Sequence, residues 1–314
     1  MTAAEECLPE ELRGGATTIA PIGAGLSGAA VYRVDAASGA FVLKISAADE
    51  PLDAWRSKLQ LRRLAADAEL APRIVHVDEP RRAVVTEFVA DRGFRMRMAD
   101  PSTREASIEQ LGRMLRRVHE LPLPADVESG DALAFLADTA AAIAADFPLP
   151  PFVRDAIARV LAEAPPPAER AFVLSHNDAN PTNLLLDDRE RLMLVDWETA
   201  SRNEPYFDLA TVALFFRFDE AASLRLLTAY DSAPVAALPP RFVYDKRLVA
   251  VMSGTKGLEL AMKDGYAGDA NAVAPSLFDF YQRLRTGDLD LNSAEGKWQF
   301  GLALVGSAFP AERH

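Results

Sequence analysis

The sequence predicts an α+β protein with a small β-rich N-terminal part and a larger, mainly helical C-terminal part. Before residue 90, short apolar or β-branched runs alternate with glycine-bearing turns, a pattern that is typical of strands. From about Asp100 onward, leucine and valine recur at helical spacing among charged residues. The pattern changes near Asp91–Gly93, so we expect one domain over 1–90 and a second over 91–314.

The expected elements follow from the same patterns. The small part should contain five strands, at Thr18–Ile22, Val31–Val34, Phe41–Ile45, Ile74–Val77 and Ala83–Val89. Its helix is expected at Leu52–Leu70, where leucines are spaced among Arg, Lys, Asp and Glu. Helices of the larger part are expected after Ser102 and at Asp131–Asp146, Phe152–Ala164, Phe207–Phe216, Ala221–Tyr230, Arg241–Gly265 and Pro275–Arg285.

Composition narrows the function classes. Hydrophobic residues make up 49% of the chain and charged residues 25%, as in an ordinary globular protein. The net charge of −12 disfavours a nucleic-acid partner and suits a cationic or metal-bound ligand, although acidity can also serve solubility alone. Cys7 is the one cysteine, so neither a disulfide nor a Cys-based metal site is expected. The chain shows no secretory signal and no apolar stretch of membrane-spanning length, so we expect a cytoplasmic protein without a membrane partner.

The stretch VLSHNDANPTNLLLDD, residues 173–188, carries the most chemistry. Five of the eight positions from His176 to Asn183 are His, Asn or Asp, and three leucines follow directly. The apolar runs Leu184–Leu186 and Leu192–Val195 predict a hairpin. If its loop is the four residues Asp188–Arg191, Asn183 lies opposite Asp196, where paired residues have Cβ atoms about 5 Å apart. An amide oxygen and a carboxylate would then meet, a pair that suits Mg²⁺.

Asp178 lies on the loop that leads into this hairpin. A carboxylate there can face the metal site without binding the metal, which is the place of a base in phosphoryl transfer. The alternative interpretation is an ordinary polar turn in which Asn and Asp serve as turn residues. The second carboxylate, Asp196, favours the functional interpretation.

These residues resemble a known family. SHNDANPTNLLLDD, followed by LMLVDWETASRNEPYFDLA, is similar to the H-x-D-x-x-x-x-N and D-[FW]-E…D-[IL]-A signatures of the aminoglycoside phosphotransferase and choline kinase superfamily. LGRMLRRVHELP, residues 111–122, resembles the helix that precedes this region in the family. The resemblance runs from about Pro21 to Phe216 and implies a two-lobed, protein-kinase-like fold. In motif order it looks closest to bacterial choline kinase-like sequences.

The resemblance also implies roles. Asp178 would be the catalytic base, and Asn183 and Asp196 would hold Mg²⁺ on ATP. Glu198, on the same side of a strand as Asp196, would reach a second metal, a water or the substrate.

Two further residues would support the loop. The resemblance implies that His176 braces the catalytic loop and that Asp208 anchors it by hydrogen bonds. A simple alternative for Asp208 is a carboxylate that the dipole favours at a helix N-terminus.

The nucleotide side is expected in the small part. PIGAGLSGAAVYRV puts glycines between two strands, where they permit close backbone approach to phosphate, so Gly23, Gly25, Ser27 and Gly28 are candidate nucleotide-binding residues. Such a hairpin is by itself usually just a turn, and the lysine one strand later favours the functional interpretation. Lys44, within FVLKI, needs a compensating anion if it is buried, and the ATP phosphates would supply one. The alternative is an edge-strand lysine in solvent. VVTEFVAD resembles the segment whose backbone, from Glu87 to Val89, binds adenine.

One departure from the family concerns the partner of Lys44. The family usually places a glutamate in the first helix, and that position falls on or near Ser57 here. Asp53 and Gln60 are the nearest substitutes, because no Glu occurs between Pro51 and Asp67. The sequence therefore does not identify the partner of Lys44. It also allows a degenerate kinase that binds nucleotide without catalysing transfer.

The resemblance implies an ATP- and Mg²⁺-dependent kinase of a small hydroxylated molecule. A choline- or ethanolamine-like amino alcohol is favoured, and Trp298, Tyr266 and Tyr281 could build an aromatic cage for it, although a residue of this kind is more often part of the core. Aminoglycosides, sugars, thiamine and macrolides are alternative acceptors. The sequence does not determine the oligomeric state.

Overall fold

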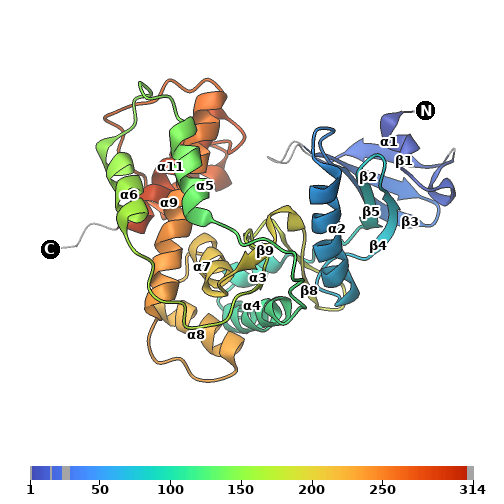
Figure 1. The fold of residues 1–314 in the computed structure, drawn as a ribbon, viewed down its shortest axis with the longest axis horizontal. Helices are drawn as coiled ribbons and strands as arrows, with labels where there is room; N and C mark the ends of the chain where they lie inside the picture. The colour runs from blue at the N-terminus through green and yellow to red at the C-terminus, as the bar shows by residue number, and fades with distance from the viewer. Residues whose placement is uncertain (1, 15, 23–28, 310–314) are drawn as a thin grey trace. The chain divides into compact units, whose positions relative to one another are not determined.

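The computed structural model describes residues 2–14, 16–22 and 29–309. The chain divides into two compact units (Figure 1). The first unit comprises Met1–Val127, Val173–Arg202 and Thr228–Ala233, and the second comprises Glu128–Phe172, Asn203–Leu227 and Pro234–His314.

The first unit is built on an antiparallel sheet in the order β1-β2-β3-β5-β4. Its strands are β1 (Thr18–Pro21), β2 (Ala30–Ala36), β3 (Gly39–Ile45), β4 (Ile74–Asp78) and β5 (Ala83–Glu87). Strand β3 lies in the middle, where Lys44 pairs with Val31 on one side and Val84 on the other. All five predicted strands are therefore present, and Lys44 is not on an edge strand.

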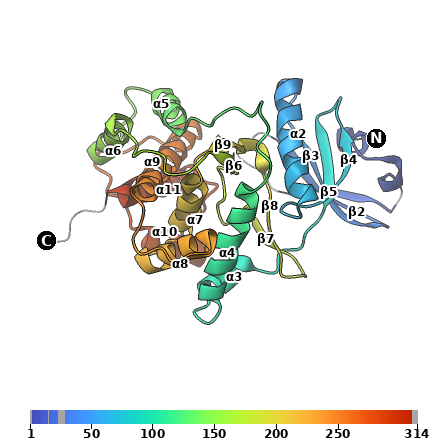
Figure 2. The same cartoon turned by 60° about the horizontal axis from the view of Figure 1, so that its bottom comes forward.

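Helical segments lie on both faces of this sheet. Helix α2 (Leu52–Asp67) packs Trp55 and Leu59 against Val84, and Figure 2 shows it running alongside the strands. Leu8 and Leu12, from the N-terminal segment that contains α1 (Ala3–Glu6) and η1 (Glu10–Leu12), belong to a second cluster. The sheet residues of that cluster are Val34, Leu43, Ala83 and Val85, which alternate along the strands with the Lys44 side.

The remainder of the first unit includes the segment 173–202. It contains α3 (Phe94–Ala99), α4 (Arg104–His119), β6 (Val173–Ser175), β7 (Leu184–Leu186), β8 (Leu192–Leu194) and η2 (Trp197–Thr199). Strands β7 and β8 form the predicted hairpin. Leu194 N donates to Leu70 O (2.8 Å), so this hairpin is tied to the segment that follows α2.

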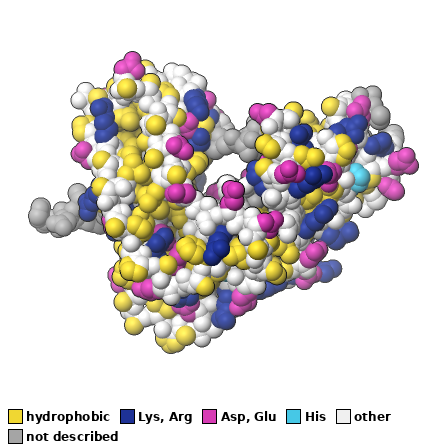
Figure 3. Space-filling model, viewed as in Figure 1, with side chains coloured by type: hydrophobic (Ala, Val, Ile, Leu, Met, Phe, Trp, Pro, Cys, Tyr) yellow, Lys and Arg dark blue, Asp and Glu magenta, His cyan; other side chains and the backbone are white. Residues whose placement is uncertain are grey.

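The second unit is helical. Its helices are α5 (Ala132–Ala142), α6 (Pro151–Ala162), α7 (Tyr206–Phe215), α9 (Pro240–Lys263), α10 (Leu277–Thr286) and α11 (Ala294–Ala308), while α8 (Glu220–Asp231) and β9 (Ser201–Asn203) cross the division. Helices α9 and α11 pack closely because Gly254 and Gly301 leave no side chain between them. On the face in Figure 3, hydrophobic side chains gather over α5, α6 and α11. Phe135 of α5 and Leu161 of α6 are exposed large hydrophobic residues.

The predicted α+β class, with a small sheet-containing part and a larger helical part, is confirmed. No helix among the residues that the structure describes is both long and apolar enough to cross a membrane.

Candidate active site

Lys44 is held by two carboxylates from the segment after β8. Its Nζ lies 2.7 Å from Asp196 Oδ1 and 2.5 Å from Glu198 Oε1. The Lys44 side chain is only 11% exposed, so these carboxylates meet its need for a counter-charge. The question that the sequence left open is answered for this structure: the partners of Lys44 come from the DWE segment and not from the first helix.

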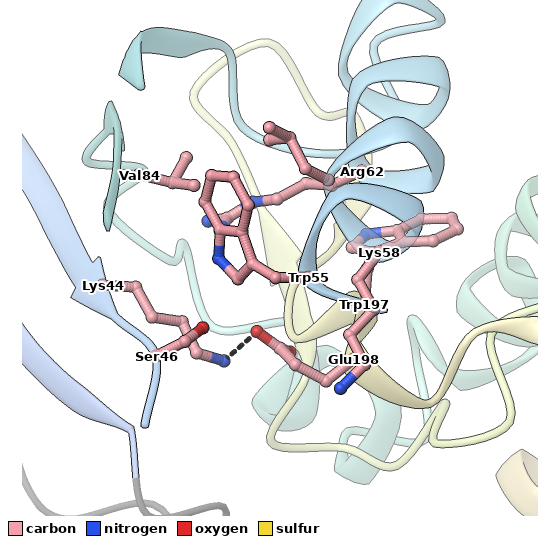
Figure 4. A pocket seen from close by; sticks show the side chains of 9 residues that line it. Lys44, Ser46, Trp55, Lys58, Arg62, Val84, Trp197 and Glu198 are labelled. Carbon is pink, nitrogen blue, oxygen red and sulfur yellow. Dashed lines mark ion pairs between the residues drawn. The ribbon is translucent and has the colours of Figure 1, made fainter. Parts of the chain in front are cut away.

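The face of α2 toward Lys44 carries cations where the family usually has a glutamate. Lys58 and Arg62 line a cavity of about 20 Å³ together with Trp55, Lys44 and Glu198 (Figure 4). Positions 55, 58 and 62 lie on one side of the helix, so helical spacing was the signal that could have identified Lys58 and Arg62.

The helix glutamate was expected on or near Ser57, and the neighbouring Lys58 does line the cavity beside Lys44, whereas Ser57 itself does not. Ser57 is exposed, and its hydroxyl donates to Asp53 O within the same helix. Asp53 and Gln60 are exposed as well, so neither substitutes for the glutamate. Counting back along the sequence identified the helix but not the side of it that faces Lys44.

Buried hydrogen bonds fix the loop that carries Asp178. His176 Nδ1 accepts from Asp178 N (3.3 Å), so the proton of the neutral ring lies on Nε2, which donates to Val195 O (3.0 Å). The ring also meets Trp197 edge to face, with centroids 4.9 Å apart. Thr199 Oγ1 donates to His176 O (3.0 Å). These contacts tie the loop to the segment that carries Asp196 and Glu198.

Both oxygens of Asp178 accept hydrogen bonds from amide side chains. Asn180 Nδ2 donates to Oδ1 and Asn183 Nδ2 donates to Oδ2, each at 2.8 Å. Burial raises the pKa of Asp178, although the Asn180 hydrogen bond and the nearby His176 oppose the rise. A carboxylate that is held in one orientation and is more basic than usual suits a proton acceptor.

The predicted register of the hairpin was wrong by one residue. Leu184 pairs with Leu194 and Leu186 with Leu192. Asp187 N donates to Arg191 O (3.0 Å), and Val195 N donates to Asn183 O (2.9 Å). The loop is therefore Asp188–Glu190, three residues and not four, and Asn183 lies opposite Val195.

The backbone at Asp196 turns out of the strand. Asp196 has φ 65° and ψ 64°, a left-handed conformation that Asp tolerates better than most residues. Glu198 consequently lies in the short helix η2 and not in a strand, so the strand argument for its orientation was wrong. It nevertheless joins Asp196 on the same lysine.

The pKa values of Asp196 and Glu198 are shifted in opposite directions. Burial acts to raise the pKa of Asp196, but the contact with Glu198 and the charge of Lys44 outweigh it and lower the pKa to about 2. Burial raises the pKa of Glu198, and the neighbouring Asp196 adds to this rise. Asp196 is therefore the stronger anion of the pair.

Two side-chain oxygens that accept no hydrogen bond from the described residues around them would suit a hard cation such as Mg²⁺. Because both Asn183 contacts to Asp178 use its Nδ2, its Oδ1 remains as an acceptor. Glu198 Oε2 is buried and has no hydrogen-bond partner. Within the described ranges, no three His, Cys, Asp or Glu side chains form a metal site on their own. Magnesium needs few protein oxygens when phosphates and water supply the rest, so this donor set fits it.

The segment after β5 presents backbone groups to a ligand. Glu87 N donates to Arg73 O (2.9 Å) and Phe88 N to Ala40 O (3.0 Å), whereas Val89 N–H meets no acceptor in the described part of the chain. The Glu87 side chain pairs with Arg73 at 2.5 Å. A free donor at Val89 fits the predicted adenine contact. The predicted phosphate-binding residues Gly23, Gly25, Ser27 and Gly28 lie outside the described residues.

A larger cavity of about 660 Å³ also borders this segment. Its lining includes Phe41, Glu87 and Met193, together with arginines and carboxylates of the hairpin. Phe41 and Glu87 pair with each other and alternate along β3 and β5 with Lys44 and Val84. This cavity therefore lies on the opposite face of the sheet from Lys44.

The remaining candidates belong to the second unit. Asp208 is fully buried in the first turn of α7. Trp298 is buried and stacks on Tyr266, with ring centroids 4.9 Å apart, while Arg217 covers the ring of Tyr281 at 5.1 Å. These three aromatic faces already have neighbours, which supports the core interpretation of Trp298 that the sequence had left open.

Comparison with known proteins identifies the family. Residues 18–241, well over half of the chain, match the profile of the phosphotransferase enzyme family. The chain belongs to this family. Membership confirms the predicted resemblance and the prediction that the protein is an enzyme of this kind.

Relatives within the family are distant. Protein LicA of Haemophilus influenzae is 42% identical over 55 residues, which span 18% of this chain and only 20% of that protein. A solved choline/ethanolamine kinase family protein from Mesorhizobium loti has a TM-score of 0.60 at 21% identity, covering 92% of both chains. An aminoglycoside phosphotransferase from Streptomyces rimosus has a TM-score of 0.54 at 24% identity, covering 74% of this chain and 92% of its own. These structures share the fold with this protein.

Proposed function

We propose that this protein is an ATP- and Mg²⁺-dependent kinase that phosphorylates a hydroxyl group of a small molecule. The arrangement of Lys44, Asp196 and Glu198, with Asp178 and Asn183 beside them, carries the proposal. It combines a cation for phosphates, oxygens for a metal and a base in one compact unit. Catalysis by such a site consists mainly of positioning and charge neutralisation.

Different residues would bind the nucleotide and accept the proton. Lys44 binds the phosphates of the nucleotide, and the backbone at Val89 receives the base. Asp178 accepts the hydrogen bond of the acceptor hydroxyl and takes its proton as the phosphoryl group transfers. His176 holds the loop so that this carboxylate stays in place.

Asn183 and Asp196 would hold the metal, and Glu198 would contribute a further oxygen. When bound, Mg²⁺ supplies positive charge to the phosphate oxygens. Asp208 would support the loop as its family motif implies.

For the acceptor, a choline- or ethanolamine-like amino alcohol is our first choice. The partial similarity to LicA and the fold of the M. loti choline/ethanolamine kinase family protein support it. The aromatic cage from Trp298, Tyr266 and Tyr281 no longer supports it, because those rings are packed against other residues. The fold of the S. rimosus enzyme keeps aminoglycosides as the second candidate, followed by sugars, thiamine and macrolides.

A degenerate, non-catalytic nucleotide-binding protein is the alternative from another class. Its main support was the missing helix glutamate. That support weakens because Asp196 and Glu198 supply the counter-charge of Lys44.

The test is ATP consumption by the purified protein against choline, ethanolamine, thiamine, several sugars, aminoglycosides and macrolides. We expect Mg²⁺-dependent phosphorylation of one acceptor class, verified by the mass of the phosphorylated product. Nucleotide binding without turnover of any acceptor in this panel would favour the degenerate protein. Phosphorylation without added Mg²⁺, in the presence of a chelator, would contradict the metal site.

A further inference from the structure

Arg62 is a charged residue of the first unit for which the proposed chemistry has no use. It projects from α2 into the cavity that Lys44 and Glu198 line (Figure 4). Within the described part of the chain its guanidinium makes no hydrogen bond and no ion pair. Burial lowers the pKa of Arg62, while the charges of Glu198 and Asp196 act in the opposite direction. Arg62 is half-buried, and a partly desolvated guanidinium without a partner calls for an explanation.

One carboxylate oxygen of Glu198 also lacks a hydrogen-bond partner among the residues that the structure describes. Its Oε1 contacts Lys44 at 2.5 Å, whereas its Oε2 is buried and has no hydrogen-bond partner. Lys58, the other cation that α2 directs to this cavity, is paired with Glu50 at 2.6 Å. Arg62 is therefore the cation lining this cavity that has no partner among the described residues.

Binding of a nucleotide would reduce the counter-charge that is available to Glu198. Lys44 serves both Asp196 and Glu198 here, and phosphates would compete for the same ammonium. A metal would in turn compete for Asp196. Glu198 would then lose its counter-charge while its carboxylate stays partly buried, at 27% side-chain exposure. A guanidinium offers several donors in a planar fork, so it is suited to receive a carboxylate under these conditions.

We propose that Arg62 is a positioning residue for Glu198, holding its carboxylate from the α2 side when Lys44 is engaged by nucleotide phosphates. This inference rests on the proposed kinase function. In the arrangement usual for the family, a glutamate of the helix pairs with the strand lysine. Here α2 would supply a cation, Arg62, and the segment after β8 would supply the carboxylate, Glu198. Lys44 would then be free to bind the nucleotide. Arg62 acts through Glu198 and touches neither nucleotide nor acceptor.

The experiment compares binding of ATP with MgCl₂, measured by calorimetric titration without acceptor, with thermal unfolding of the nucleotide-free protein. Arg62→Met should weaken binding about tenfold, a usual size for coupling between sites. It should not lower the unfolding temperature, because Arg62 has no partner to lose in the nucleotide-free protein. Arg62→Lys should restore most of the binding. The matched control is Arg63→Met, an exposed arginine on the same helix that does not line the cavity, and it should bind as the wild type does.

A double-mutant cycle identifies the partner. If Arg62 acts through Glu198, Arg62→Met in a Glu198→Gln background should weaken binding no further. Additive losses, or a lowered unfolding temperature that Arg62→Lys does not restore, would indicate a structural role and overturn the inference. Equal binding by Arg62→Met and the wild type would overturn this inference alone. A wild-type protein that binds no ATP would overturn the proposed function and this inference together.

Discussion

Lys44 Nζ lies 2.5 Å from Glu198 Oε1, and the same ammonium reaches Asp196 Oδ1 at 2.7 Å. A lysine at the centre of the sheet is thus neutralised by a turn 152 residues later in the chain. The first helix contributes no carboxylate to this contact. One ammonium is therefore the shared counter-charge of two carboxylates from the same turn.

Replacing Lys44 tests this relationship. Lys44→Met should weaken ATP binding by at least tenfold, because the phosphates lose their cation. It should also lower the free energy of unfolding by about 1–2 kcal/mol, since two partly exposed carboxylates lose a shared counter-charge. Calorimetric titration and urea unfolding measure the two effects. Lys58→Met is the matched control, because Lys58 pairs with Glu50 at partial exposure, and unchanged ATP binding is expected.

The carboxylate of Asp178 should matter for turnover and not for nucleotide affinity. Asp178→Ala removes the proton acceptor, so the rate of phosphoryl transfer to the identified acceptor should fall by about 10²–10⁴-fold. ATP affinity measured without Mg²⁺ should change little, because Asp178 approaches the nucleotide side only through Asn183, a proposed metal ligand. Asp188→Ala, at an exposed position in the hairpin loop, serves as the control. Full activity of Asp178→Ala would show that the assigned base is wrong.

Asp196 should determine the magnesium dependence of nucleotide binding. Asp196→Asn keeps a side chain that tolerates the left-handed backbone, so the turn should persist while the charge is lost. We expect MgCl₂ to strengthen ATP binding in the wild type and to have little effect in the variant, as measured by titration with and without MgCl₂. An unchanged Mg²⁺ effect in Asp196→Asn would remove Asp196 from the metal site.

The hairpin shows what the sequence could and could not predict about the site. Apolar runs on both sides of a polar turn were sufficient to predict the strands β7 and β8. The loop length was not encoded in that pattern. A three-residue loop places Val195 opposite Asn183, and the backbone turns out of the strand at Asp196. A backbone turn of this kind leaves no periodic signal.

The helices show a similar limit. The amphipathic ones were predicted within a few residues, because a polar face contrasts with a buried face along α2 and α4. Helix α11 was not predicted. Most of the residues of α11 are buried, so polar and apolar residues do not alternate along it with the spacing that predicts a helix. The side of α2 that faces Lys44 was missed because tertiary packing determines it.

The contact between α9 and α11 should be sensitive to a single methyl group. A Cβ at Gly301 would lie 2.6 Å from Leu258 Cγ and 2.7 Å from Gly254 O. Gly301→Ala should therefore lower the free energy of unfolding by about 1–3 kcal/mol through overpacking, measured by urea unfolding. Gly14→Ala is the control, because nothing lies within 4 Å of its added Cβ, and it should be neutral or slightly stabilising. Equal stability of the two variants would contradict the close packing of these helices.

Asp245 should make the stability of the second unit depend on pH. Burial raises the pKa of its carboxyl from 3.8 to about 7, although the charge and hydrogen bonds of Arg241 oppose the rise and Glu204 adds to it. Because the folded protein binds this proton more tightly than the unfolded chain does, the contribution is full below about pH 4. It is lost as the pH rises through about 7.

The two pKa values differ by about 3 pH units, which corresponds to a loss of about 4 kcal/mol at most. Asp245→Asn stays neutral at every pH, so it should remove this contribution to the pH dependence. Urea unfolding of both proteins between pH 5 and pH 8.5 measures it. The wild type should lose stability relative to Asp245→Asn as the pH rises. A difference between the two proteins that stays constant across this range would mean that Asp245 is already ionised at pH 5, held so by Arg241.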